Sequence, residues 1–175
     1  MADSASMVIN GSYLPDEIQK KFIGETYKYT PANDTEGWYY KLTNVTTTAS
    51  IDLIDDGHSY VTFGNGTGTA QGRDTGTDMP QTHADDVVKF LFIKHLGIRE
   101  TGATNTSDSI YLCTDGGTAA NDLSTAIEIL PTETWFVKLN CTIANLHARS
   151  GAKANGGAGG NSIQCLVAAI IDDVA

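Results

Sequence analysis

Apolar residues in this chain recur in short runs of strand length, separated by polar segments rich in turn-forming residues. The run Val87–Leu96 carries large apolar groups on both sides, which is the pattern of a central strand covered on both faces. Trp38–Thr43 alternates instead, with Trp38, Tyr40 and Leu42 on one side, which predicts a half-buried strand. These two patterns therefore predict a β protein with a packed interior.

Further strands are predicted at near-regular spacing. They are Thr47–Ile54, His58–Phe63, Ile110–Cys113, Ala126–Leu130, Thr134–Leu139, Thr142–Ala148 and Ile163–Ile171. Asp55–Gly57 is read as the tight turn before a return strand, and Pro131 as a corner between two strands. About eight to ten such strands predict an all-β fold, a β-sandwich of jelly-roll-like type. Similar pentapeptides at Trp38–Leu42 and Trp135–Leu139 suggest equivalent edge positions in the two sheets, or coincidence.

The one helix signal lies near the start of the chain, at Tyr13–Gly24. Three apolar residues there recur every four positions, namely Leu14, Ile18 and Phe22. Two interpretations remain open: a short helix packed on its own domain, or an arm that docks onto a neighbouring subunit. We expect residues 1–24 to form an N-terminal arm with this helix, residues 27–34 a loop, and residues 25–175 the sandwich domain.

Charge narrows the range of partners. The chain has 175 residues and a net charge of −10, and its 11 Lys and Arg are scattered. Nucleic acids and anionic membranes need a basic patch, so neither is expected as a partner. The first residues lack the pattern of a secretory signal, and we expect synthesis in a reducing cytoplasm. Cys113, Cys141 and Cys165 lack metal-ligand spacing and are predicted to be buried, reduced thiols.

Several acidic turns raise the question of a metal site. The candidate ligands are Asp55, Asp56 and His58, then His83, Asp85 and Asp86, and the pair Asp74 and Asp78 in the polar segment Gly64–Asp85. None of these groups completes a known calcium or zinc motif, and acidic turns in β proteins are usually solvated. We therefore predict no metal and no cofactor, although calcium binding in the acidic loops stays open.

Catalytic constellations are equally sparse, and no catalytic residue is predicted. Gly64–Gly68 lacks the lysine and helix of a phosphate loop. Glu128 and Glu133 have the chemistry of a glycosidase pair, but the Leu-Pro-Thr-Glu corner explains the second one as a turn residue. His95 and His147 fall within strands, where a hydrogen-bonded structural histidine is the common outcome. We expect a protein that is not an enzyme.

Aromatic residues offer one further possibility. Carbohydrate-binding modules use exposed Trp and Tyr on a β face, and Trp38, Tyr39, Tyr40 and Trp135 are the residues that would form such a platform. Aromatic side chains in sandwiches more often serve the core or an interface. A sugar-binding platform and a core or interface role both remain open for these residues.

The second half of the chain resembles a family. Its runs KFLFIKHLG, SDSIYLCTDGG, AIEILPTETWFVKL, NLHARSG and IQCLVAAIID, between Val87 and Ile171, are similar in layout to small β-sandwich virion proteins of tailed bacteriophages. Those include capsid decoration, neck and fibre-associated proteins. The resemblance implies a structural role, with the major capsid protein or other virion proteins as partners, a homo-oligomer and a location in the virion. A capsid decoration protein is the first expectation, and a tail, neck or fibre component the alternative.

Overall fold

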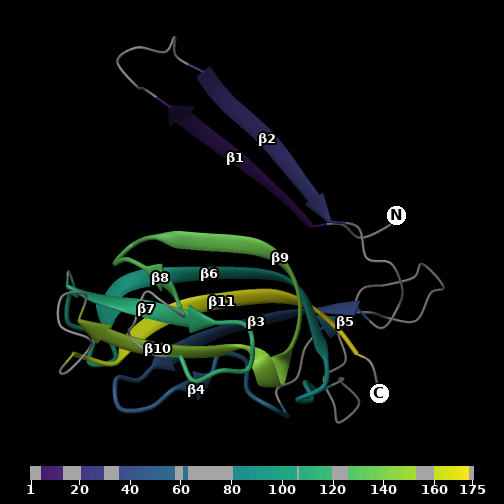
Figure 1. The fold of residues 1–175 in the computed structure, drawn as a ribbon. Coiled ribbons are helices and arrows are strands. Elements are labelled where there is room, and N and C mark those ends of the chain that lie inside the picture. The colour runs from purple at the N-terminus through teal and green to yellow at the C-terminus, as the bar shows by residue number, and fades with distance from the viewer. Residues whose placement is uncertain are drawn as a thin grey trace.

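The computed structural model describes residues 5–13, 21–29, 36–57, 61–62, 81–105, 107–119, 126–152 and 160–173. These residues form strands paired in antiparallel fashion, with one short 3-10 turn, and the prediction of an all-β sandwich is confirmed (Figure 1). Two sheets pack face to face, and a separate two-stranded hairpin precedes them.

The larger sheet has five strands and holds most of the long strands. Their order is β5 (Val61–Thr62), β3 (Glu36–Val45), β11 (Ile163–Asp172), β6 (Val87–Arg99) and β9 (Thr134–Thr142). β11 pairs with β3 along its whole length and with β6 on its other side, so the last strand of the chain lies at the centre of the sheet. β9 forms one edge, beside β6.

The smaller sheet has four strands. Their order is β4 (Ile51–Asp52), β10 (His147–Ala152), β7 (Asp108–Cys113) and β8 (Ile127–Ile129), and the 3-10 turn η1 (Ile143–Asn145) joins β9 to β10. The chain passes repeatedly between the two sheets, because β3, β6, β9 and β11 lie in one and the strands between them mostly in the other.

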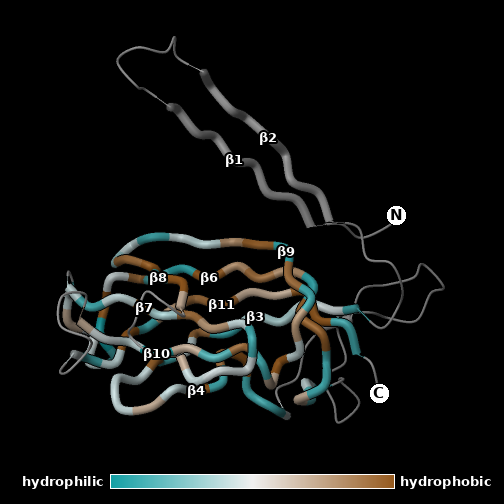
Figure 2. The backbone as a smooth tube through the Cα atoms, viewed as in Figure 1, coloured by the Kyte–Doolittle hydropathy of each residue, from teal (hydrophilic) through white to brown (hydrophobic). Residues whose placement is uncertain are grey.

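The core lies between the sheets. Its fully buried members include Tyr39, Leu91, Ile93, Ile110, Leu112, Leu146, Val167 and Ala169. Hydrophobic residues are concentrated along β6 and β11 (Figure 2). The strand predicted at Val87–Leu96 is present as β6, with Leu91 and Ile93 in the core, but its other side is covered only in part: Phe90 is buried, Phe92 is half-buried and Lys94 is exposed. Each fully buried aliphatic side chain stabilises the fold by roughly 1.5–3 kcal/mol.

The N-terminal prediction needs correction. Tyr13 ends strand β1 (Ala5–Tyr13) and Lys21–Gly24 begin strand β2 (Lys21–Tyr29), so both ends of the predicted helix are strand, while residues 14–20 lie outside the described part. Residues 27–29, predicted as loop, belong to β2. The arm–domain boundary proposed at residue 24 falls inside this strand, and the division of the chain into two parts stays a prediction.

Three other predictions need correction, and the first of them assumed that neighbours in sequence pair with one another. β4 pairs with β10 and β5 with β3, so the segment after Asp55–Gly57 changes sheet instead of returning beside Ile51–Asp52. The predicted strand Thr142–Ala148 is interrupted by η1. The two similar pentapeptides lie in β3 and β9 of the same sheet, so they are not equivalent positions in two sheets, and the alternative of coincidence remains.

Candidate functional site

The most unusual surface of this protein is the outer side of the five-stranded sheet. Directly paired residues share a face, so the strand registers define its members: Trp38, Tyr40 and Leu42 on β3; Ile170, Ala168 and Leu166 on β11; Phe90, Phe92 and Lys94 on β6; and Lys138, Phe136 and Thr134 on β9. We call this set the outer sheet face. Its middle row, Tyr40–Ala168–Phe92–Phe136, is entirely apolar or aromatic.

Exposure is greatest on β3. Tyr40 is 66% exposed, Leu42 60% and Trp38 36%, whereas Tyr39 between them is completely buried. The row that begins at Trp38 is more covered farther along, since Ile170 is buried and Phe90 is 5% exposed. The exposed apolar area is thus centred on Tyr40 and Leu42. An isolated exposed leucine is ordinary, but a contiguous apolar row on a sheet face is typical of a contact surface.

The exposed charges of the outer sheet face are positive, whereas the chain as a whole is negative. Its charged members are Lys94 and Lys138, both exposed and without an ion pair among the described residues. The next row on the same side of β3 and β11, Glu36–Asp172, carries two largely buried carboxylates. The chain as a whole has a net charge of −10. The face therefore offers an apolar centre with positive charge toward β9, a composition suited to binding a neutral or acidic apolar partner.

The outer side of the four-stranded sheet differs, because its polar groups are occupied by one another. Glu128 accepts hydrogen bonds from Ser109 Oγ at 2.7 Å and from Tyr111 OH at 3.4 Å. Burial and the Glu128 carboxylate raise the pKa of Tyr111. His147 Nε2 lies 3.1 Å from Asp52 Oδ1 across β10 and β4. Among the described residues of this side, these polar groups bond to one another, and no row of exposed apolar side chains like that of β3 is present.

The proposed carboxylate pair does not act together. Glu133 Oε2 accepts the backbone N–H of Leu130 at 2.9 Å, and Glu133 N donates back to Leu130 O at 3.0 Å. Thr132 within this corner has a φ of 69°. Glu133 therefore closes a tight turn, as the sequence indicated, while Glu128 bonds to β7 hydroxyls.

Two of the metal candidates, Asp55 and Asp86, are likewise engaged in local structure. Asp55 forms an ion pair with Lys41. Asp86 is buried, and its Oδ2 accepts the backbone N–H of His83 at 2.8 Å, so it closes a turn before β6. His58, Asp74, Asp78 and the glycine-rich segment Gly64–Gly68 lie outside the described residues. Within the described ranges, no three His, Cys, Asp or Glu residues are arranged to hold a metal ion.

His95 is a buried structural histidine, as predicted. Its Nδ1 accepts the Gly97 N–H at 3.0 Å, so the other ring nitrogen, Nε2, carries the proton and donates to Asp108 O at 2.9 Å. Burial lowers the pKa of His95, partly opposed by its hydrogen bond to Asp108. The ring is neutral and holds the β6 end against the start of β7.

The three cysteines are free thiols, and two of them, Cys113 and Cys165, are buried. Burial raises the pKa of Cys165 to about 12 and also raises the pKa of Cys113 and Cys141. The prediction of buried thiols is confirmed for the first two, while Cys141 is partly exposed. Protonated thiols of this kind are poor nucleophiles.

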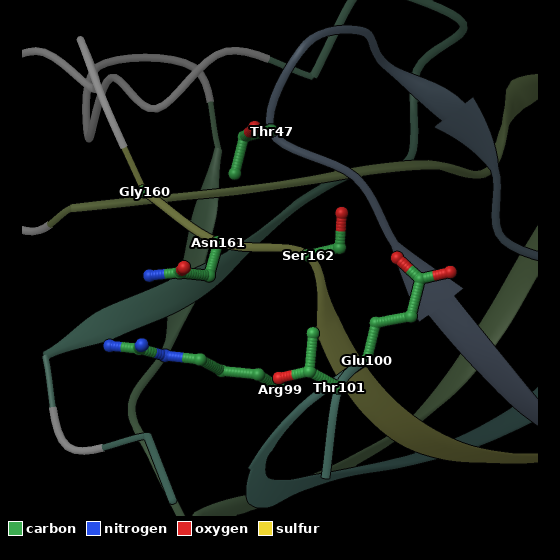
Figure 3. Close-up of a pocket in the computed structure, with 7 residues that line it drawn as sticks. All are labelled: Thr47, Arg99, Glu100, Thr101, Gly160, Asn161 and Ser162. Atoms are coloured by element: carbon green, nitrogen blue, oxygen red, sulfur yellow. The ribbon is translucent and has the colours of Figure 1, made fainter. Parts of the chain in front are cut away.

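A polar pocket of about 380 Å³ opens between the β3–β4 connection, the end of β6 and the start of β11 (Figure 3). The guanidinium of Arg99 lies alongside Asn161, and its Nε is buried without a hydrogen-bond partner among the described residues. Asn161 Nδ2 donates to Asp108 Oδ2 at 2.8 Å, and Glu100 lies on the other side of the pocket. The lining of the pocket contains one cation, Arg99, and one carboxylate, Glu100, and none of the candidates named from the sequence.

The four aromatic residues proposed as a platform divide between two faces. Trp38 and Tyr40 belong to the outer sheet face, whereas Tyr39 is buried in the core and Trp135 packs against it. Sequence alternation had placed Trp38, Tyr40 and Leu42 on one side without indicating which side faces solvent. The sequence therefore predicted the alternation on which the outer sheet face depends, but not that this side is exposed.

A scan against family models and searches of curated proteins and of solved structures found no match to this chain. In the described ranges, no helix has the length and apolar character required to cross a membrane.

Proposed function

We propose that this protein is a structural protein of a bacteriophage virion, most specifically a capsid decoration protein, that assembles through its outer sheet face. The observation that supports this proposal is the exposed apolar row around Tyr40 and Leu42 on a rigid sheet. A structural protein needs a fixed, preformed contact surface, and side chains on a strand are held more precisely than side chains on a loop.

The energetics favour burial of this row in a partner. Covering a leucine or an aromatic side chain fully is worth roughly 1.5–3 kcal/mol, and central, well-packed aromatic residues dominate most interfaces. Tyr40 and Leu42 lie on β3 at one side of the face, and Lys94 and Lys138 lie on β6 and β9 at the other side. An apolar area beside charged side chains is a composition found in protein–protein contacts.

The assignment to a virion rests on the resemblance of the second half of the chain to small β-sandwich phage proteins. The net charge of −10 fits an outer layer, because mutual repulsion keeps particles apart. The proposed partners are the major capsid protein or further copies of this chain, with synthesis in the host cytoplasm and no nucleic acid or membrane involved. Calcium binding and catalysis form no part of the proposal.

A binding experiment with particles tests this function. Leu42→Glu puts a carboxylate in the exposed row, and Ala144→Glu puts the same charge on the exposed turn η1 as a matched control. Cosedimentation with particles that lack the protein measures binding, and thermal unfolding checks the fold of each variant. We expect L42E to weaken binding at least about tenfold, equivalent to about 1.4 kcal/mol, and A144E to bind like the natural chain. Equal binding by both variants would exclude the outer sheet face.

A tail, neck or fibre location is the alternative within the same class. Decoration proteins occur in far more copies per particle than connector components do. Quantitative mass spectrometry of purified particles therefore separates the two locations, by the ratio of this chain to the major capsid protein.

Carbohydrate binding is the second candidate, favoured by one observation. Trp38 and Tyr40 lie two positions apart on the same side of β3, about 7 Å from each other along the strand, so both rings can stack on successive sugars. A glycan array with the natural chain and Tyr40→Ala decides it. If the natural chain binds glycans, Y40A does not, and L42E binds particles like the natural chain, then carbohydrate binding is supported and the virion proposal is wrong.

A further inference from the structure

Arg99 is a cation whose side chain is not paired with any group that the structure describes. It is the last residue of β6, and its side chain lines the polar pocket together with Asn161 (Figure 3). No ion pair among the described residues includes it, and its Nε is buried without a hydrogen-bond partner. Because buried polar groups are nearly always satisfied, an unpaired one marks a place where a bound water, ion or ligand is expected.

The accessible end of this guanidinium is the one that carries its two terminal nitrogens. Nε of Arg99 is closed off from solvent, whereas Nη1 and Nη2 are not among the buried nitrogens and bond to no described residue either. These two nitrogens form a planar fork of N–H donors. A fork of this kind matches the two oxygens of a carboxylate, and such charge-assisted hydrogen bonds are roughly twice as strong as neutral ones.

Backbone hydrogen bonds fix this part of the pocket. Arg99 N donates to Ala103 O and Gly102 N donates to Arg99 O, both at 2.8 Å, and these bonds close the turn after β6. Glu100 N donates to Ser162 O at 2.9 Å and ties the same turn to the segment that begins β11. A site held in this way loses little conformational freedom when it binds a ligand.

Asn161 is a second polar side chain of the pocket with a fixed orientation. Its Nδ2 donates to Asp108 Oδ2 at 2.8 Å, and its main-chain O accepts a hydrogen bond from Ser150 Oγ at 2.8 Å. Because Nδ2 bonds to Asp108, Oδ1 of Asn161 is left as an acceptor. The same bond occupies the buried Asp108 carboxylate, which belongs to none of the ion pairs among the described residues.

The rest of the lining limits the charge and the polarity of a ligand. Its one carboxylate, Glu100, projects away from the Arg99 guanidinium, and its Oε1 lies 3.4 Å from Asn44 Nδ2. One cation with a carboxylate on the far side favours a single negative charge over a dianion such as phosphate. The hydroxyls of Thr101 and Ser162 bond to no described residue, so they are available to hydroxyl groups of the ligand.

We propose that this pocket binds a small monocarboxylic acid that carries hydroxyl groups. Its carboxylate accepts hydrogen bonds from Nη1 and Nη2 of Arg99, and its hydroxyls bond to the polar side chains of the lining. The volume of about 380 Å³ lies in the range of small-molecule sites, about 300–1,000 Å³. The inference goes beyond the proposed function, because the pocket shares no residue with the outer sheet face.

An NMR titration of the ¹⁵N-labelled full chain tests the pocket. Sodium gluconate is the ligand added, with sodium acetate as the bare carboxylate, glucose as the neutral polyol and inorganic phosphate as the dianion, all at constant ionic strength. The Nε–Hε signal of Arg99 reports binding. The control signal is that of Arg149, whose Nε already donates to Thr47 O at 3.0 Å. We expect gluconate to shift the Arg99 signal saturably and the Arg149 signal by much less.

Two variants that each remove one positive charge separate the pocket from general effects of charge. Arg99→Gln removes the fork, and Lys41→Gln removes the partner of Asp55 in an ion pair at the surface. The backbone amide signals of Thr101 and Ser162 follow gluconate binding in both variants, and thermal unfolding checks their fold. We expect R99Q to weaken gluconate binding at least about tenfold and K41Q to leave it within about twofold of the natural chain.

The proposal is overturned if gluconate leaves the Arg99 signal unmoved, or if R99Q and K41Q bind gluconate equally. It is also overturned if acetate binds as tightly as gluconate, because the hydroxyl lining then has no role. Equal binding of glucose, or tighter binding of phosphate, contradicts the monocarboxylate in the same way. If R99Q does not fold, the titration of the natural chain with its Arg149 control decides. Particle binding by L42E tests the proposed function separately, so either proposal can fail without the other.

Discussion

His95 is expected to contribute to the stability of this protein through two hydrogen bonds and through a pH-dependent term. Two substitutions at this position can measure these contributions separately. The ring is completely buried, its Nδ1 accepts the Gly97 N–H at 3.0 Å, and its Nε2 donates to Asp108 O at 2.9 Å. Asp108 O also accepts a hydrogen bond from Asn105 Nδ2 at 2.8 Å. Loss of the ring therefore leaves Asp108 O with a donor but leaves the Gly97 N–H with none.

The cost of each substitution follows from these partners. His95→Leu removes both bonds and strands a buried N–H donor, which costs about 1–3 kcal/mol, with about 0.5–1.5 kcal/mol more for the bond to Asp108. His95→Asn keeps an acceptor near the position of Nδ1 and loses the Asp108 bond alone. We expect H95L to lower the free energy of unfolding by about 2–4 kcal/mol at pH 8 and H95N by about 1 kcal/mol.

The direction of the pH effect follows from the lowered pKa of His95. The unfolded chain takes up a proton as pH falls through 6.5, the ordinary value, while the folded chain resists until lower pH. The contribution of His95 to stability is thus fully present above pH 6.5 and is lost as pH falls toward the folded pKa, by at most about 1.4 kcal/mol per pH unit. A proton on Nδ1 would also face the Gly97 N–H, donor against donor.

Urea unfolding between pH 8 and pH 5 measures both effects. The difference in unfolding free energy between the natural chain and H95N should shrink as pH falls below 6.5, because the Asn variant carries no titrating ring. H95L and H95N should differ by the cost of the stranded N–H at every pH. If the two variants are equally stable, or if the natural chain and H95N respond to acid identically, the hydrogen-bond argument is refuted.

Two further predictions concern the backbone and the thiols. Gly97 has a φ of +70°, and a Cβ there would lie 2.9 Å from Thr132 Cγ2, so Gly97→Ala should lower the free energy of unfolding by about 1–3 kcal/mol. Adding Thr132→Gly to the same chain should restore part of this loss, as measured by urea unfolding. A G97A variant within about 0.5 kcal/mol of the natural chain, which is the scatter of surface changes, would contradict the close contact. With a thiol reagent at pH 8, peptide mapping should find Cys141 labelled first and Cys113 and Cys165 only on unfolding, because burial keeps those two protonated and inaccessible. Labelling of Cys165 at the rate of Cys141 would show that the sandwich opens readily.

Much of the strand content could be predicted because it depends on local periodicity. Val87–Leu96 has apolar groups at odd and even positions, and β6 has one side in the core and a partly exposed apolar side on the outer sheet face. Trp38–Thr43 alternates, and β3 alternates between buried and exposed residues. The polar corner after Leu130 and the turn at Asp55–Gly57 were predicted from their turn-forming residues. These features need only a few neighbouring residues to be specified.

The N-terminal helix illustrates a limit of periodicity. Of the three apolar residues that suggested the helix, Phe22 lies in β2, while Leu14 and Ile18 lie outside the described residues. The pairing of β1 with β2 joins residues up to 24 positions apart, from Ala5 to Tyr29, and no local rule encodes it. The local helix signals at Tyr13–Gly24 therefore gave way to strand at both ends.

Local periodicity is enough to predict that this protein is built of strands and that residues alternate along Trp38–Thr43. It is not enough to predict that Tyr39 faces the core while Tyr40 and Leu42 face solvent, because a period of two does not say which side is covered. That choice depends on β11, which pairs with β3 from more than a hundred residues away, for example Ala168 with Tyr40. The candidate interface thus follows from the register between distant strands, which is a property of the folded sheet.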